Sequence, residues 1–241
     1  MLKTIFFDAA GTLFESRRPI GDSYAAVAHD FGANVSGRKV SAAFRRAFSS
    51  AHGLAFGPGR PADELRRLER EWWRERVAET FADLHQFDDF GAYFNALFEF
   101  FGDPANWVAY PDVVPALEEL KAAGLRMGVI SNFDARLYRL LKGLDLARFF
   151  ESVTISSEAG YAKPARQLFE AALVRMGVAP GEAIHVGDAP HLDVTGANAA
   201  GIEAILIQRE ENSGTADTSK PIAATVMTSF DQLVAMVRTR I

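Results

Sequence analysis

Several polar side chains come directly after short apolar runs, where the chain would leave a buried strand. Asp8, Ser131 and Asp188 stand in such places, and Lys163 and Asp193 lie in polar turns further along. A carboxylate can attack an electrophile or bind a metal ion, a hydroxyl can hold a substrate oxygen, and an ammonium can offset negative charge. These residue types can therefore support nucleophilic chemistry on a substrate that gathers negative charge.

Strands that alternate with helices must position these residues. Five apolar runs rich in β-forming residues indicate strands at residues 4–7, 125–130, 153–155, 183–186 and 204–207. Helical patterns, each followed by a glycine, lie at residues 113–123, 167–176 and 192–200. This order predicts an α/β fold with a doubly wound, Rossmann-like parallel sheet covered on both faces. In such sheets ligands bind at the carboxyl ends of the strands.

Residues 15–105 have a different pattern, with helical spacing and no strand-like runs. Apolar residues such as Leu65, Leu68, Trp72 and Val77 recur at steps of three to five with charged residues between them. Glycine and proline residues cluster near residues 102–111, as they do in links between domains. We therefore predict an α/β core domain of residues 1–14 and 106–241, with an all-helical domain of residues 15–105 inserted after the first strand.

Four segments, taken in order, resemble the four motifs of the haloacid dehalogenase-like superfamily of hydrolases. They are Phe7-Asp8-Ala9-Ala10-Gly11-Thr12-Leu13, Ile130-Ser131-Asn132, Ala162-Lys163-Pro164 and Val186-Gly187-Asp188-Ala189-Pro190-His191-Leu192-Asp193. Each segment alone is a common turn, but four in order, three of them at strand ends or just beyond, make the resemblance specific. The helical insertion after the first motif matches the place of the cap in the subfamily I type of this superfamily.

The resemblance implies a role for each matching residue. Asp8 would be the nucleophile that forms a covalent aspartyl intermediate, which water then hydrolyses. Ser131 and Asn132 would bind the substrate. Lys163 would bind it too and offset the negative charge on the transferring group.

The resemblance also implies a magnesium ion. The ion would contact Asp8, the main-chain carbonyl of Ala10 and Asp188. Asp193 would either bind the ion itself or hold the groups that bind it. Three carboxylates brought together would raise one another's pKa values and oppose an anionic substrate unless a cation lies among them. Mg²⁺ suits this place because it prefers oxygen ligands and bridges to phosphate.

Position 10 departs from the family pattern. Phosphatases of the superfamily carry a second aspartate two residues after the nucleophile, where it protonates the leaving oxygen, but this chain has Ala10. Loss of a positioned acid lowers a rate by about 10²- to 10⁴-fold. We therefore expect a phosphatase of a small phosphorylated metabolite that uses a good leaving group, such as an aryl or acyl phosphate, or a proton donor borrowed from elsewhere.

Three alternatives remain open. The 2-haloacid dehalogenases also lack the second aspartate, because halide leaves without a proton, but they resemble this chain less well at Asp188 and Asp193. Phosphonoacetaldehyde hydrolases have alanine at the position of Ala10 and depend on a cap lysine. Lys39 is the only lysine in the insertion of this chain. The third alternative is a binding or regulatory protein that kept the fold and lost turnover.

The composition narrows the class of partner. Among 241 residues the net charge is -5, which argues against a nucleic-acid partner, and no apolar run reaches the ~18 residues that a membrane span needs. The first residues lack the features of a signal peptide, so we expect a cytoplasmic protein that acts on a small molecule. We expect structural roles for His185 and His191, and a mobile loop at the polar residues 210–220.

Overall fold

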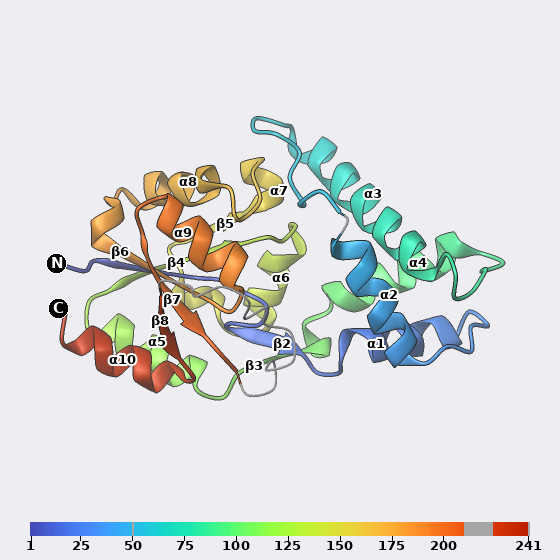
Figure 1. The fold of residues 1–241 in the computed structure, drawn as a ribbon, viewed down its shortest axis with the longest axis horizontal. Coiled ribbons are helices and arrows are strands. Elements are labelled where there is room, and N and C mark those ends of the chain that lie inside the picture. The colour runs from blue at the N-terminus through green and yellow to red at the C-terminus, as the bar shows by residue number, and fades with distance from the viewer. Residues whose placement is uncertain (50, 210–223, 241) are drawn as a thin grey trace.

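Six parallel strands form the central sheet of the computed structural model, which describes residues 1–49, 51–209 and 224–240 (Figure 1). The strands lie in the order β5-β4-β1-β6-β7-β8. Their bounds are Thr4–Phe7 (β1), Arg126–Ser131 (β4), Ser152–Ile155 (β5), Ala183–Gly187 (β6), Glu203–Ile207 (β7) and Thr225–Met227 (β8). The predicted α/β fold and its five strands are confirmed, and β8 is an additional strand. The predicted loop at residues 210–220 lies outside the described residues.

The strand order brings the three predicted polar strand ends together. β1 pairs with β4 on one side and with β6 on the other, and all three run in the same direction. Because the carboxyl ends of parallel strands share one edge of the sheet, the residues that follow β1, β4 and β6 must be neighbours. The strand order reverses beside β1, because the chain runs outward from β1 through β4 to β5 and then returns to β6 on the other side of β1. Ligands bind at such a point in this class of fold.

Helices cover both faces of the sheet (Figure 1). One face packs against α5 (Val113–Ala122), α6 (Arg136–Gly143) and α10 (Phe230–Arg238), and the other against α8 (Arg166–Met176) and α9 (Thr195–Ala199). The shorter elements are α7 (Ser156–Ala159), the 3₁₀ turns Pro104–Asn106, Ala147–Phe149 and Pro180–Glu182, and a π-helical turn, Pro190–Val194. The π-helical turn occupies the start of the helix that the sequence predicts at residues 192–200.

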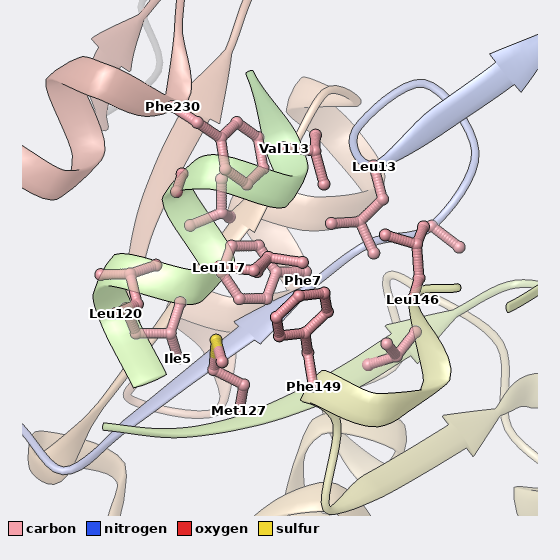
Figure 2. Close-up of a cluster of buried hydrophobic side chains, with 14 of the residues drawn as sticks. Ile5, Phe7, Leu13, Val113, Leu117, Leu120, Met127, Leu146, Phe149 and Phe230 are labelled. Carbon is pink, nitrogen blue, oxygen red and sulfur yellow. The ribbon is translucent and has the colours of Figure 1, made fainter. Parts of the chain in front are cut away.

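Side chains of β1 alternate between the two layers, as the period of a strand requires. Ile5 and Phe7 join the cluster under α5 and α10, whereas Phe6 joins the cluster under α8. Figure 2 shows Phe7 among side chains from α5, α10 and the neighbouring strand β4. Burying each such side chain contributes about 1.5–3 kcal/mol, so β1 is anchored on both faces and fixes the position of Asp8.

In the described part of the helical insertion, four α-helices lie between β2 and β3. They are α1 (Ile20–His29), α2 (Gly37–Ser49), α3 (Ala62–Phe81) and α4 (Phe90–Gly102). Aromatic rings fill its interior, and the rings of Phe87 and Tyr93 stack with centroids 4.1 Å apart. None of the described helices is both long and apolar enough to cross a membrane.

A two-stranded antiparallel ribbon connects the insertion to the sheet layer. It pairs β2 (Phe14–Ser16) with β3 (Trp107–Ala109), which the sequence did not predict. The insertion lies beyond the carboxyl ends of the sheet strands (Figure 1). The helical segment therefore stands over the edge of the sheet where Asp8 lies.

The insertion also bonds directly to the loop after β4. Trp73 of α3 donates its indole N–H to Oδ2 of Asp134, 2.5 Å away, and Glu69 accepts a hydrogen bond from the backbone of Ala135. Arg136 donates to the carbonyl of Phe98 in α4. These hydrogen bonds join the insertion to the loop after β4.

Candidate active site

Three aspartates meet at the edge of the sheet. One carboxylate oxygen each of Asp8, Asp188 and Asp193 lies within 4.8 Å of the others. Asp8 follows β1 and Asp188 follows β6, while Asp193 belongs to the π-helical turn after β6. The site therefore gathers three residues that the sequence predicts to act together.

Lys163 joins two of these aspartates. Its ammonium nitrogen lies 2.6 Å from Oδ1 of Asp8 and 2.6 Å from Oδ1 of Asp193. The whole residue is only 5% exposed. Hydrogen bonds between charged groups in such an interior are short and strong, so Lys163 fixes Asp8 and Asp193 relative to each other.

Asn132 holds the backbone of Lys163. Its side-chain oxygen accepts a hydrogen bond of 2.7 Å from the Lys163 N–H, and its amide nitrogen donates to the Lys163 carbonyl. The sequence predicts Asn132 as a substrate ligand, but both ends of its amide are bonded to another loop. Asn132 thus positions Lys163, and its contact with substrate stays a prediction.

Ser131 and Ala10 lie at the same edge. Ser131 is the last residue of β4 and is 3% exposed. Ala10 lies in the turn after β1, half-buried, where it forms an isolated bridge with Phe14. Their predicted contacts, Ser131 with substrate and the Ala10 carbonyl with the ion, stay predictions.

Two glycines let the backbone approach the aspartates closely. Gly11 has φ +90°, and a Cβ atom there would lie 2.4 Å from Oδ2 of Asp188. A Cβ atom at Gly187 would lie 2.2 Å from Cγ of Asp193. Any other residue at either position would displace a carboxylate, because real Cβ contacts are never so short.

The electrostatics of the site differ from one carboxylate to the next. Burial raises the pKa of Asp8, although Lys163 lowers it. Burial, with the charges of Asp8 and Asp193, raises the pKa of Asp188 to about 7. Burial also opposes ionisation of Asp193, but Lys163 and the hydrogen bond from His185 hold its pKa below the usual value. Burial disfavours the charge on Lys163, yet Asp193 and Asp8 raise its pKa.

The donor set suits a hard divalent cation. Among the described residues, three carboxylates lie beside one ammonium group, so the fully ionised cluster has a net charge of two negative units. Burial first, and then the charges of Asp8 and Asp193, raise the pKa of Asp188, so a cation placed here would favour its ionised form. Oxygen-only donors favour Mg²⁺ over softer metals, and the residues present therefore fit such an ion.

His185 supports the cluster from inside the sheet. It is fully buried in β6, its ring lies edge-on to Phe169, and its Nε2 lies 2.9 Å from Oδ1 of Asp193. Burial lowers the pKa of His185, which favours the neutral ring, so Nε2–H donates to the carboxylate. The predicted structural role of His185 is thereby given a specific partner.

A second bracing group was not predicted from the sequence. The hydroxyl of Thr12 donates to Oδ1 of Asp188 at 3.3 Å, and Arg209 donates to the carbonyl of Thr12 at 3.0 Å. Arg209 also binds both carboxylate oxygens of Asp112, at 2.7 and 2.8 Å. Arg209 lies after β7 and belongs to no recognisable sequence motif. Only the fold shows that it supports the turn of Thr12, which binds Asp188.

Comparisons with known proteins find related sequences. A family model for haloacid dehalogenase-like hydrolases matches residues 2–201. Haloacid dehalogenase-like hydrolase domain-containing protein 3 of Danio rerio is 31% identical over 236 residues, which cover 97% of this chain and 96% of that protein. The phosphoserine phosphatase of Thermus thermophilus is 40% identical over 111 residues, or 46% of this chain and 45% of that protein.

Solved structures share the fold. A HAD phosphatase from Thermococcus onnurineus superposes with a TM-score of 0.65 at 24% identity over 98% of both chains. The L-2-haloacid dehalogenase from Xanthobacter autotrophicus, with chloropropionic acid covalently bound, gives a TM-score of 0.75 at 21% identity over 99% of both chains. At such identities these two likenesses concern the fold alone.

Proposed function

This chain belongs to the haloacid dehalogenase-like hydrolase family, and on that premise we propose that it is a magnesium-dependent phosphatase that forms an aspartyl phosphate on Asp8. The observation that carries the proposal is the cluster of Asp8, Asp188 and Asp193 with Lys163 bonded inside it. Such a cluster can hold both a nucleophile and a cation. The similarity of half the chain to a phosphoserine phosphatase supports phosphate as the transferred group.

In the proposed reaction Asp8 attacks the phosphorus atom. Lys163 holds Oδ1 of Asp8, so we assign Oδ2 to the attack and expect the leaving oxygen to depart on the opposite side. The Ser131 hydroxyl binds a phosphoryl oxygen, and the Lys163 ammonium neutralises charge that gathers in the transition state. Water then hydrolyses the aspartyl phosphate. Asp8, the Ala10 carbonyl, Asp188 and Asp193 would hold Mg²⁺, which when bound neutralises charge on the phosphoryl oxygens.

Ala10 determines which substrates react fast. An aspartate two residues after the nucleophile would protonate the leaving oxygen, and the methyl group of Ala10 has no proton to give. We propose that the substrate is a small phosphorylated metabolite whose leaving group departs without strong acid assistance. Aryl and acyl phosphates meet that condition because their leaving oxygens are weak bases.

Residues 15–105 are proposed to act as a cap on a core of residues 1–14 and 106–241. The contacts of Trp73 and Glu69 with the loop after β4 support this division, because they close the insertion over the sheet edge. A closed cap excludes water while the aspartyl phosphate forms and must open for product release.

Two other chemistries are less well supported. A 2-haloacid dehalogenase would also tolerate Ala10, but three carboxylates around one lysine leave a charge excess that favours a metal-dependent reaction. A phosphonoacetaldehyde hydrolase needs a desolvated lysine in the insertion, and Lys39 lies exposed on α2. A protein that binds ligands without turnover would keep the same fold, and the activity test separates it from an enzyme.

Hydrolysis of 4-nitrophenyl phosphate or acetyl phosphate by the purified full chain tests the proposal. We expect turnover with magnesium, its loss on chelation, and its loss in Asp8→Asn, which keeps the shape of the side chain but is not a nucleophile. Hydrolysis that survives chelation or Asp8→Asn would contradict the mechanism. Turnover of 2-chloropropionate in place of both phosphates would support the dehalogenase.

A further inference from the structure

A cavity of about 470 Å³ opens beside the turn that follows the proposed nucleophile, Asp8. Ala10 and Gly11 of the turn after β1 form part of its wall. The rest of the wall includes Arg18, which precedes α1, and Arg45 of α2. The cavity therefore lies between the reacting edge of the sheet and the helical insertion.

Two of the residues that line this cavity carry positive charge. Among the described residues of its wall, Arg18 and Arg45 are the cationic residues and Glu15 is the acidic one. Oε2 of Glu15 accepts a hydrogen bond of 3.2 Å from the hydroxyl of Tyr110. Within the described residues neither Arg18 nor Arg45 forms an ion pair with a carboxylate, whereas Arg136 and Arg209 bind Asp134 and Asp112. Two guanidinium groups are thus available to a ligand in a protein whose net charge is -5.

Gly11 separates the cavity from the carboxylate cluster. Gly11 lines the cavity and also lies directly against Asp188, since a Cβ atom added to it would meet Oδ2 of Asp188 at 2.4 Å. The wall residue Tyr110 also lies near this carboxylate. Burial and the charges of Glu15 and Asp188 raise the pKa of the Tyr110 hydroxyl. A molecule bound at Asp8 can therefore extend past Gly11 into the cavity.

We propose that Arg18 and Arg45 form a subsite for a second anionic group of the substrate, a carboxylate or a second phosphate. The proposal rests on the proposed phosphatase activity and names its substrate class as small phosphate esters that carry another anion. Guanidinium groups suit this task because their planar array of N–H donors matches carboxylate and phosphate oxygens. Trp107 and Tyr110 supply flat walls for the part of the molecule between the two anions.

A neighbouring cavity is unsuitable for that second group. It has a volume of about 80 Å³ and is lined by aromatic and aliphatic side chains such as Tyr24, Phe94 and Phe98. Its one charged residue, Arg136, already binds Asp134 at 2.6 Å. An anion placed there would lose its hydration without gaining a free cation.

Binding of stable phosphonates tests the subsite apart from turnover. The full chain with magnesium would be titrated by calorimetry with phenylphosphonate, 3-carboxyphenylphosphonate and 1,3-phenylenebisphosphonate. We expect at least one of the two probes with a second anionic group to bind about tenfold more tightly than phenylphosphonate. A charge-assisted hydrogen bond provides a gain of that size. The better of the two identifies the second anion as carboxylate or phosphate.

Substitutions locate the effect. Arg18→Ala and Arg45→Ala should each remove most of the preference while leaving the affinity for phenylphosphonate unchanged. Arg38→Ala is the matched control, because Arg38 is also exposed on α2 but does not line the cavity. Equal affinity for all three probes, or a preference that survives both cavity variants, would overturn the subsite. Failure to hydrolyse both 4-nitrophenyl phosphate and acetyl phosphate, with the preference intact, would instead refute the phosphatase and leave the anion subsite standing.

Discussion

The ammonium nitrogen of Lys163 lies 2.6 Å from Oδ1 of Asp8, although 155 residues separate them in the chain. The same nitrogen lies equally close to Asp193, and all three side chains are buried. A buried cation shared by two carboxylates is stable only while every partner is present. Lys163 is therefore both part of the proposed chemistry and a condition for the shape of the site.

Replacement of Lys163 by methionine should destabilise the protein and abolish turnover. Removing one partner of a buried ion pair costs about 3–5 kcal/mol, because the other charges stay buried without compensation. Saturating magnesium should recover part of that stability by replacing the lost positive charge, but should not restore activity. Urea unfolding with and without magnesium measures this, with Lys142→Met, at an exposed lysine of α6, as control. Similar stability of the two variants would show that the Lys163 pairs contribute nothing.

Replacement of Ala10 by aspartate should restore acid catalysis. The new carboxyl group can protonate the leaving oxygen, so kcat/KM for an alkyl phosphate should rise by about 10²-fold or more. The gain should be much smaller for 4-nitrophenyl phosphate, whose leaving oxygen needs little help. Ala10→Asn has nearly the same shape without the acid and should show no gain. If aspartate gives no gain, Ala10 is more than a missing proton donor.

Replacement of Gly11 by alanine should weaken magnesium binding. The new Cβ would overlap Asp188, and φ of +90° is strained for any residue with a side chain. We expect at least about tenfold weaker magnesium affinity, together with about 1–3 kcal/mol lower stability from the strain. Gly32→Ala is the matched control, since Gly32 has φ +83° with open space around it. It should show the strain without the change in magnesium affinity, and equal loss in both variants would argue against a special role for Gly11.

Magnesium affinity should depend on pH near neutrality. Burial and the neighbouring carboxylates raise the pKa of Asp188 to about 7, so below that pH the ion must displace a proton to bind. Apparent affinity should be nearly constant well above pH 7 and fall by about tenfold per pH unit below it. Calorimetric titration between pH 5.5 and 8.5 measures the slope. A flat profile would show that Asp188 does not ligate the ion.

The sequence predicted the site wherever sheet geometry determines it. Asp8, Ser131 and Asp188 each follow an apolar run, and parallel strands carry their carboxyl ends to one edge. Lys163 belongs to the short motif Ala162-Lys163-Pro164. We could assign it a role only because it lies in the expected order among the four motifs of the family. Short apolar runs, together with motifs in the family's order, are therefore enough to predict this fold and the carboxylate cluster.

The contacts that the sequence did not predict join segments that lie far apart in the chain and meet only in the folded protein. Arg209 binds the backbone of Thr12 across 197 residues, and no local pattern marks either partner. The strands of the ribbon have three residues each, too few to show an alternating period. Asn132 was predicted to meet substrate, yet its amide binds the backbone of Lys163 because the two loops meet at that point.

Chemical trapping of the aspartyl phosphate tests the central claim most directly. The full chain would be mixed with magnesium and acetyl phosphate, quenched in acid, and reduced with borohydride, which converts an aspartyl phosphate into homoserine. Peptide mass spectrometry should find homoserine at position 8, and the Asp8→Asn protein should show none. Steady hydrolysis of the phosphate without homoserine at position 8, or with homoserine at another aspartate, would contradict the assignment of Asp8 as the nucleophile.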